Sequence, residues 1–426
     1  MADPACIAEV RLWGRTVGAV AELEDGRVIF EYDEPFRRSG LAISPIHLPL
    51  DRQGPVEFPE LSRVPAFEGL PGVLADALPD RFGNAVIRKY FDDRGKPEAA
   101  LSPVQKLLYI GNRAMGALTF RPAHRIPRNA REEEALEVAG LVAAARQVVE
   151  GSAEVAVPEI IRLGSSAGGA RAKAVILWNR PKNQVRSAFA TPRPGDDSWM
   201  IKYDGVGELD VPDPEPRPYN RIEYAYSVLA RNAGIDMSET WLLEERGLGH
   251  FMTRRFDRPD GGRLHLHTLG GMEHVDYNRP GLYSCEQYLR LALTLQLGYP
   301  ALAEAYRRIA FNILAVNQDD HVKNFGFLMD PEGRWSLSPA YDLTYARGGG
   351  YTRRHQISLG GKYDDFSAGD LLQLGARFGV EKDGREILQQ VGEALGGWPQ
   401  AARKAGVPDD RIAAIGGSHR LDCIPG

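Results

Sequence analysis

Three polar residues in the C-terminal half of the chain, Asp319, Asn324 and Asp342, have the types and spacing that phosphoryl transfer requires. Asn324 follows Asp319 by five residues, and Asp342 lies eighteen residues beyond Asn324. A carboxylate such as Asp319 can orient a hydroxyl nucleophile and accept its proton. The side-chain oxygens of Asn324 and Asp342 are ligands of the kind that Mg²⁺ prefers. Because phosphoryl transfer depends on positioning and charge stabilisation, the ordered set predicts a phosphotransferase site.

The spacing of Asp319 and Asn324 equals that of the protein-kinase catalytic loop, where the aspartate accepts a hydroxyl proton and the asparagine holds magnesium. His321 and Lys323 lie between them. We place both with the nucleotide-binding residues, since Lys323 would offset charge near a transferred phosphate. The alternatives are a structural His321, packed in the loop and bonded to a backbone carbonyl, and a solvated Lys323.

A glycine-rich segment, 164–173, lies well before the catalytic residues. Its small side chains leave backbone N–H groups free to wrap an anion. It is not a Walker A loop, because the G-K-[ST] ending is missing. A flexible hairpin loop is the alternative, but the position before the apolar run 174–178 favours a cover over the ATP phosphates. The residues expected to approach ATP are Ser165, Ser166, Ala167, Gly168 and Gly169.

Lys202 ends the apolar run 199–203, which follows the glycine-rich segment. This order matches the kinase lysine that reaches the nucleotide phosphates. Glu223, in a helical segment further on, is a candidate ion-pair partner. A solvated lysine at a strand end and a surface glutamate are the alternatives. Later, 251–258 runs from an apolar strand into a polar linker, where an adenine ring could meet backbone groups.

The composition is that of an ordinary globular protein. The 426 residues are 43% hydrophobic and 26% charged, with a net charge of -5, which gives no overall bias toward nucleic acid or anionic membranes. Cys6, Cys285 and Cys423 lack paired spacing, which argues against a disulfide framework and a zinc site. We find no signal peptide, and no apolar window approaches the roughly 18 residues that span a bilayer. We therefore expect a cytoplasmic protein.

Hydrophobic periodicity predicts an α+β chain. Short strands are predicted within 10–32, with a hairpin at Asp25–Gly26. Helices are predicted at 131–149 and 219–233. From Ser284 onward the chain is predicted to be mostly helical, apart from a hairpin beside the catalytic loop. The predicted parts are 1–150 (strands plus helices), 151–258 (the glycine-rich loop and strands) and 259–426 (a mainly helical lobe with the catalytic loop).

The chain resembles the HipA family of bacterial toxin serine/threonine kinases over nearly its whole length. Two of the shared motifs, NQDDHVKNF and LSPAYD, surround the candidate catalytic residues. The shared segments are 17–18, 30–32, FEGLPGVLADALPD at 67–80, SAGGA at 166–170, RFDR at 255–258, NQDDHVKNF at 317–325 and LSPAYD at 337–342.

The resemblance implies a two-lobe fold like that of protein kinases, with an extra N-terminal subdomain and a helical C-terminal lobe. It implies use of ATP and Mg²⁺ to phosphorylate a protein serine, in the best-known cases on an aminoacyl-tRNA synthetase. It also implies autophosphorylation in the glycine-rich loop, at Ser166 or alternatively Ser165, where added charge would repel ATP phosphates. The backbone of Arg254 and Phe256 would contact adenine. A HipB-like helix-turn-helix antitoxin would be the partner, with DNA contacted mainly through it.

Other functions remain open on the residues alone. The same fold could phosphorylate a small molecule, or the chain could be a catalytically weak binding or co-repressor module acting with a DNA-binding partner. The presence of Asp319, Asn324, Asp342 and Lys202 argues against a degenerate enzyme. A metal-dependent hydrolase is a distant alternative without a second ligand cluster. The basic, glycine-rich segment 347–362 is either a substrate- or phosphate-facing loop or a solvated one.

Overall fold

The structure, a computed structural model, describes residues 4–79, 82–85, 87, 101–122, 141–142, 145, 171–188, 190–206 and 218–425. The predicted helix at 131–149 lies almost entirely outside these residues, and so does the predicted boundary near residue 150. The predictions at both places therefore remain predictions.

The N-terminal part is built on an antiparallel sheet. The turn between its second and third strands confirms the hairpin predicted at Asp25–Gly26, and Gly26 has a φ of +81°, which suits glycine. Among the described residues, the strand order is β4-β3-β2-β1-β5. The strands are β1 (Pro4–Leu12), β2 (Arg15–Leu23), β3 (Val28–Tyr32), β4 (Val56–Glu57) and β5 (Leu118–Arg121). The helices are α1 (Glu34–Arg37), η1 (Pro59–Leu61), α2 (Gly72–Ala75) and α4 (Pro103–Ile110).

A second antiparallel sheet carries Lys202 as the last residue of its central strand, as predicted. Its order is β7-β6-β8-β10-β9 in the part of the chain that the structure describes. The helix α7 packs against β9 and β10, and it ends just before Gly234, as its sequence pattern predicts. The elements are β6 (Lys173–Asn179), β7 (Gln184–Ser187), β8 (Asp196–Lys202), α7 (Tyr219–Asn232), β9 (Thr240–Glu245) and β10 (Leu248–Arg254).

The C-terminal part is mainly helical. The helices are η4 (Pro259–Gly261), α8 (Leu269–Glu273), α9 (Cys285–Thr294), α10 (Tyr299–Leu314), η5 (Val322–Asn324), η6 (Gly350–Arg353), α11 (Ala368–Arg377), α12 (Glu381–Gly396), α13 (Trp398–Lys404), α14 (Asp409–Gly416) and η7 (Leu421–Cys423). The strands are β11 (His265–Thr268), β12 (Tyr283–Ser284), β13 (Gly326–Met329), β14 (Trp335–Leu337) and β15 (Ile357–Ser358). No helix within the described segments has the length and apolar character that crossing a bilayer would need.

The predicted hairpin beside the catalytic loop is present as β13 and β14, with β11 added at its edge. The prediction of mostly helix after Ser284 is wrong for 315–367, which is largely irregular apart from this hairpin and the short elements η5, η6 and β15. The reason is physical: this segment is held by hydrogen bonds to other parts of the lobe rather than to its own helical turns. Ala340 N–H, for example, donates to the Asp236 carbonyl at 2.7 Å.

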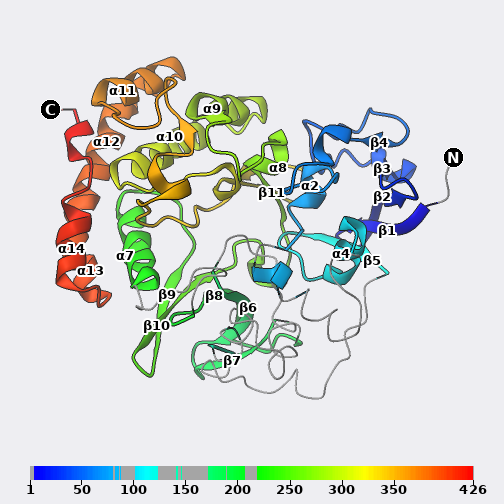
Figure 1. Ribbon diagram of the computed structural model, residues 1–426, viewed down its shortest axis with the longest axis horizontal. Helices are drawn as coiled ribbons and strands as arrows, with labels where there is room; N and C mark the ends of the chain where they lie inside the picture. The colour runs from blue at the N-terminus through cyan, green and yellow to red at the C-terminus, as the bar shows by residue number, and fades with distance from the viewer. Residues whose placement is uncertain are drawn as a thin grey trace.

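The N-terminal sheet and the second sheet share one hydrophobic core. Phe30 and Phe120 of the first sheet belong to the same buried cluster as Ile176 and Trp199 of the second. A separate cluster fills the C-terminal helices, with Trp398 among its largest side chains. Figure 1 shows helices α9 to α14 gathered at one side of the molecule and the N-terminal strands at the other. The sheet that carries Lys202 is thus backed by the N-terminal part.

Asp257, just after β10, ties the N-terminal part to the linker that leads into the C-terminal part. Its side chain is fully buried and accepts hydrogen bonds from the Gly116 N–H (2.7 Å), Arg255 (2.7 and 3.0 Å) and Arg258 (2.6 Å). Arg258 also donates to the Ala114 carbonyl at 3.0 Å. Burial alone would raise the pKa of Asp257, but the two guanidinium groups outweigh it and lower the pKa to about 2.

Replacing Asp257 with alanine should lower the free energy of unfolding by about 3–5 kcal/mol, because it leaves two largely buried guanidinium groups without a counter-charge. Urea unfolding at pH 7 measures the change. The matched control is Asp197→Ala, which removes an ion pair between half-exposed side chains and should cost less than about 1 kcal/mol. Equal losses in the two variants would contradict the role of Asp257. Because its pKa is depressed, the stabilisation should be present above about pH 4 and disappear as the pH falls toward 2.

Candidate active site

The loop that carries Asp319 leaves the end of α10 through a strained turn. Val316 has a φ of +57°, a left-handed conformation that a β-branched residue rarely adopts. Asn317 is buried there and is bonded twice to Asn312, through its backbone N–H (2.9 Å) and through its side-chain amide (3.0 Å). Strained backbone of this kind is concentrated at functional sites, where surrounding contacts hold it in place.

Asp319 is positioned by two amide side chains and keeps one oxygen available. Gln356 Nε2 donates to Asp319 Oδ1 at 2.7 Å, and Asn324 Nδ2 donates to the Asp319 backbone carbonyl at 2.8 Å. The side chain is 45% exposed. Its Oδ2 accepts no hydrogen bond from any described residue, so this oxygen can face a substrate hydroxyl, as a proton acceptor must.

Lys202, Glu223 and Asp342 meet in one buried cluster. The Lys202 ammonium lies 2.6 Å from Glu223 Oε1 and 2.5 Å from Asp342 Oδ1. The Lys202 and Glu223 side chains are 9% and 3% exposed, so Glu223 is not the surface acid of the alternative interpretation. Asn220 on α7 donates to the Lys202 backbone carbonyl at 3.0 Å. The second sheet, α7 and the Asp342 loop therefore converge on a single ammonium group.

These three charges shift one another's pKa values. Burial alone would lower the pKa of Lys202, but attraction by Asp342 and Glu223 outweighs it and raises the pKa. Burial alone would raise the pKa of Asp342, but Lys202 and then Lys173 outweigh it and lower the pKa. For Glu223 burial dominates, so its pKa is raised in spite of Lys202. The Lys202–Asp342 pair therefore remains charged at neutral pH.

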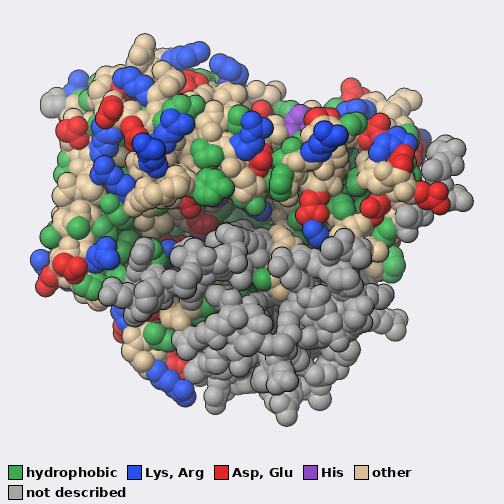
Figure 2. All heavy atoms as spheres, in the orientation of Figure 1, with side chains coloured by type: hydrophobic (Ala, Val, Ile, Leu, Met, Phe, Trp, Pro, Cys, Tyr) green, Lys and Arg blue, Asp and Glu red, His purple; other side chains and the backbone are tan. Residues whose placement is uncertain are grey.

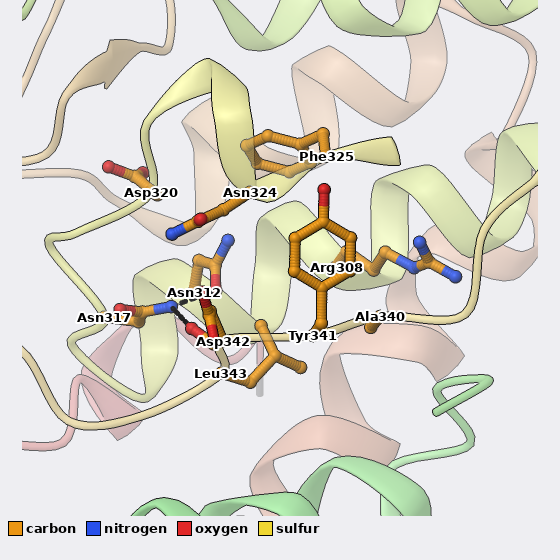
Figure 3. Close-up of a pocket in the computed structure, with 10 residues that line it drawn as sticks. All are labelled: Arg308, Asn312, Asn317, Asp320, Asn324, Phe325, Ala340, Tyr341, Asp342 and Leu343. Atoms are coloured by element: carbon orange, nitrogen blue, oxygen red, sulfur yellow. Dashed lines mark hydrogen bonds between the residues drawn. The ribbon is translucent and has the colours of Figure 1, made fainter. Parts of the chain in front are cut away.

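Asn324 and Asp342 line the same small pocket, which Figure 3 shows with Asn317 beside them. Asn324 commits its Nδ2 to the Asp319 carbonyl, which leaves its amide oxygen for other partners. Asp342 commits Oδ1 to Lys202, and its Oδ2 has no partner among the residues described. One oxygen from each side chain is thus available. This donor set fits Mg²⁺, which takes one or two protein oxygens and completes its coordination with phosphates and water.

Asp320, adjacent to Asp319, has a different role. It is buried, with its two oxygens bonded to the Gln356 backbone N–H (2.6 Å) and to His355 Nδ1 (2.8 Å). It therefore anchors the segment that carries Gln356. Across the described residues, no three His, Cys, Asp or Glu side chains are grouped as a metal site would need. The distant hydrolase alternative, which used Asp319, Asp320 and His321, gains no support.

His321 and Lys323 both lie near the Tyr277 ring. His321 Nε2 is 3.9 Å from Asp319 Oδ1, and its buried Nδ1 has no hydrogen-bond partner among the described residues. The backbone-carbonyl bond of the structural alternative is therefore not seen there. The Lys323 ammonium lies 4.9 Å from the centre of the Tyr277 ring, and its backbone carbonyl accepts from Tyr341 at 2.8 Å. Both residues thus lie at the edge of the catalytic loop.

Arg254 and Phe256 lie in the linker after β10. The Arg254 side chain is exposed and bonded to Asp197 at 2.8 Å, and its backbone N–H donates to the Glu239 carbonyl at 2.9 Å. That backbone donor is therefore already used. The Phe256 N–H has no acceptor within the described segments, and the Phe256 ring lies 5.7 Å from that of Tyr341. Of the two backbone N–H groups, only that of Phe256 is available to a nucleotide base.

The glycine-rich loop is outside the described residues, which resume at Arg171. Its predicted phosphate contacts and its predicted modified serine therefore stay predictions. The residues concerned are Ser165, Ser166, Ala167, Gly168 and Gly169.

The sequence analysis did not identify the residues that position this site through hydrogen bonds. Gln356 is one, and nothing in its local sequence distinguishes it. Arg308 is another: it is buried on α10 and donates to Glu304 (2.7 Å) and to the Ser338 carbonyl (2.8 Å), which positions the chain before Asp342. The i,i+4 spacing of Glu304 and Arg308 was the available signal.

The HipA N-terminal domain matches residues 8–121, and the HipA-like C-terminal domain matches residues 165–398. A curated protein of Sinorhizobium fredii (strain NBRC 101917 / NGR234), named "Putative kinase Y4dM", is 25% identical over 356 residues, which cover 79% of this chain and 76% of that protein.

Among solved structures, HipA of Shewanella oneidensis MR-1, in a complex with HipB and its operator DNA, matches with a TM-score of 0.67. The identity is 16%, and the match covers 98% of this chain and 96% of that one. The Helicobacter pylori proinflammatory kinase CtkA matches at a TM-score of only 0.36, with 11% identity over 54% of this chain and 88% of that one, and we base nothing on it.

The fold is therefore α+β and kinase-like, with an additional β-containing N-terminal part and a helical C-terminal lobe, as predicted. The chain belongs to the HipA family, since the C-terminal domain match alone spans more than half of its length and the N-terminal domain matches as well.

Lys202→Met should destabilise the protein by about 3–5 kcal/mol, because it leaves Glu223 buried without a counter-charge. Lys202→Met combined with Glu223→Gln should recover part of that stability, since the buried Glu223 carboxylate is then neutral and only Asp342, whose side chain is 25% exposed, has lost its counter-charge. Urea unfolding measures both, and Lys404→Met, which changes an exposed lysine on α13, is the control with no expected effect. A double variant as unstable as the single one would contradict the assignment.

Proposed function

We propose that this protein is an ATP- and Mg²⁺-dependent serine/threonine protein kinase of the HipA type. The observation that carries the proposal is the pair of contacts made by Lys202, at 2.6 Å to Glu223 and 2.5 Å to Asp342. In protein kinases this lysine–glutamate pair and the metal-binding aspartate must be in place together. Asp319 and Asn324, on the catalytic loop, supply the remaining residues of a kinase site. The relative named as a kinase, Y4dM, supports the same activity.

The proposed reaction transfers the γ-phosphoryl group of ATP to a serine or threonine hydroxyl. Asp319 orients the hydroxyl and takes its proton, the hydroxyl oxygen bonds to the γ-phosphorus, and the bond to the β-phosphate oxygen breaks to release ADP. Lys202 places positive charge where the phosphate oxygens lie. When bound, Mg²⁺ supplies further neutralisation of that charge, and the free oxygens of Asn324 and Asp342 would hold it.

Membership of the HipA family suggests the protein substrate and the regulation that we propose. An aminoacyl-tRNA synthetase is the proposed class of target. Autophosphorylation is proposed at Ser166, or alternatively at Ser165, where a phosphate would repel those of ATP. A HipB-like antitoxin is the proposed partner, with DNA reached mainly through it, because the matched Shewanella HipA structure is a complex with HipB and operator DNA.

The decisive experiment is the intact mass of phosphatase-treated protein after incubation with ATP and Mg²⁺. We expect the wild type to gain a single phosphate on Ser166 or Ser165, identified by peptide mapping. Asp319→Ala should slow this gain by a factor of about 10² to 10⁴, because the proton acceptor is lost. Asp365→Ala, which changes an exposed acid, is the matched control and should label at the wild-type rate.

Thermal unfolding of the same samples separates loss of chemistry from loss of folding. Asp319→Ala should unfold close to the wild-type temperature, since its side chain is half exposed. An Asp319→Ala protein that gains phosphate at the wild-type rate would remove Asp319 from the mechanism. A wild type that binds ATP but gains no mass, and labels no added protein, would count against the protein-kinase activity itself.

A further inference from the structure

An exposed, basic loop borders the candidate catalytic site. The loop 347–354 holds three arginines, Arg347, Arg353 and Arg354, three glycines and no acidic residue. All three arginine side chains are exposed, and so is Tyr351, at 63%. A fourth exposed arginine, Arg279, precedes Gly281, whose N–H donates to the Gln356 carbonyl at 2.8 Å. We call these four side chains the arginine rim.

Both ends of the loop are fixed to the catalytic loop. At one end, the Ala346 carbonyl accepts from the Gln318 N–H at 2.8 Å, and the Ala346 N–H donates to Val316 at 3.2 Å. At the other end, Gln356 bonds to Asp319 Oδ1 at 2.7 Å and, through its backbone, to Asp320 at 2.6 Å. The loop therefore begins and ends beside the residue that would take the substrate proton.

These anchors limit how far the rim can lie from Asp319. A chain of ten residue steps, from Ala346 to Gln356, that leaves and returns can extend no more than about 18 Å from its base, at about 3.5 Å per residue. Arg347 directly follows one anchor, Ala346, and Arg354 lies two residues before the other, Gln356. The charges at the base of the loop are therefore close to the phosphoacceptor position. Figure 2 shows Lys and Arg side chains gathered on the face of this lobe.

The described residues do not neutralise the charge of the rim. In the described part of the chain, Arg279, Arg347 and Arg353 form no ion pair, and Arg354 lies over the Tyr363 ring at 4.4 Å. Before the loop, the nearest acid in sequence is Asp342, which is bonded to Lys202 at 2.5 Å. After the loop, the nearest acids are Asp364, which is bonded to Gln318 at 3.1 Å, and Asp365. An uncompensated cluster of guanidinium groups is a site for carboxylate or phosphate groups of a partner.

We propose that the arginine rim binds acidic side chains that flank the phosphoacceptor residue of the protein substrate. This inference rests on the proposed kinase function, and it adds the kind of sequence that the kinase would select. An acidic peptide is favoured over a nucleic acid for two reasons. The residues next to the acceptor must lie beside Asp319, where the loop is anchored, and the chain as a whole carries a net charge of -5, which would repel a long polyanion.

The first test is binding in the absence of ATP, which does not depend on activity. Fluorescent 12-residue peptides with one central serine carry glutamate, glutamine or lysine on both sides. We expect the wild type to bind the glutamate peptide about tenfold more tightly than the lysine peptide near 0.1 M salt, with the difference falling toward 1 M salt as charges are screened. The double variant Arg347→Glu with Arg353→Glu should reverse this order.

The matched control is Lys404→Glu with Arg411→Glu, which makes the same change of net charge on exposed side chains of α13 and α14. It should keep the wild-type preference. Equal affinities of the wild type for all three peptides, or a reversal in the control as well, would overturn the proposal. So would tighter binding of a 12-nucleotide RNA that is lost in Arg347→Glu with Arg353→Glu, since the occupant would then be a nucleic acid.

The second test measures phosphorylation of the same peptides by kcat/KM. The glutamate peptide should be preferred by wild type, and the double rim variant should prefer the lysine peptide. The control Lys404→Glu with Arg411→Glu should keep the wild-type preference. Failure of the two proposals can be told apart. If the binding preference holds but neither the peptides nor the protein itself gain phosphate, the kinase function has failed. If all peptides are phosphorylated equally, only the specificity has failed.

Discussion

The active-site geometry depends on one buried ammonium group. Lys202 joins Glu223, 21 positions along the chain, to Asp342, 140 positions away, so a strand, a helix and a loop of the other lobe share one contact point. Removing these charges from water is costly, and such a cluster is weak evidence for a stabilising role. The cluster instead fixes how the strand, the helix and the loop are placed around Lys202, because any other placement of Glu223 would leave a buried carboxylate without a cation.

The N-terminal part supports this arrangement from the side away from the C-terminal helices. Its sheet shares a hydrophobic core with the sheet that carries Lys202, and Trp199 and Ile201, on the strand that ends in Lys202, belong to that core. Asp257 accepts from the Gly116 N–H, and its partner Arg258 donates to the Ala114 carbonyl, so the linker is fixed to the N-terminal part. The extra domain is therefore part of the scaffold of the site.

The features predicted correctly from the sequence are those that depend on neighbouring residues in the chain. The strand-end position of Lys202 and the two antiparallel hairpins follow from hydrophobic period and turn chemistry, which act over a few residues. The pairing of Lys202 with Glu223 was one of two alternatives, and it came from the order of motifs in protein kinases. The helical expectation for 315–367 failed because this segment is ordered by distant partners such as Asp236, which no local pattern records. Gln356 was missed for the same reason: its partner Asp319 is 37 positions away, and one glutamine among ordinary neighbours carries no signal.

Two adjacent carboxylates, Asp319 and Asp320, show how the fold assigns different roles to identical side chains. Their side chains are 45% and 4% exposed. Both oxygens of Asp320 are committed, to His355 and to the Gln356 backbone, so it has no oxygen left for a substrate. Among the described residues, the Asp319 side chain accepts a hydrogen bond from Gln356 alone and keeps its second oxygen. Gln356 is positioned by the buried acid and in turn positions the exposed one. Asp320 therefore cannot replace Asp319, since turning it outward would release the residue that orients the catalytic carboxylate.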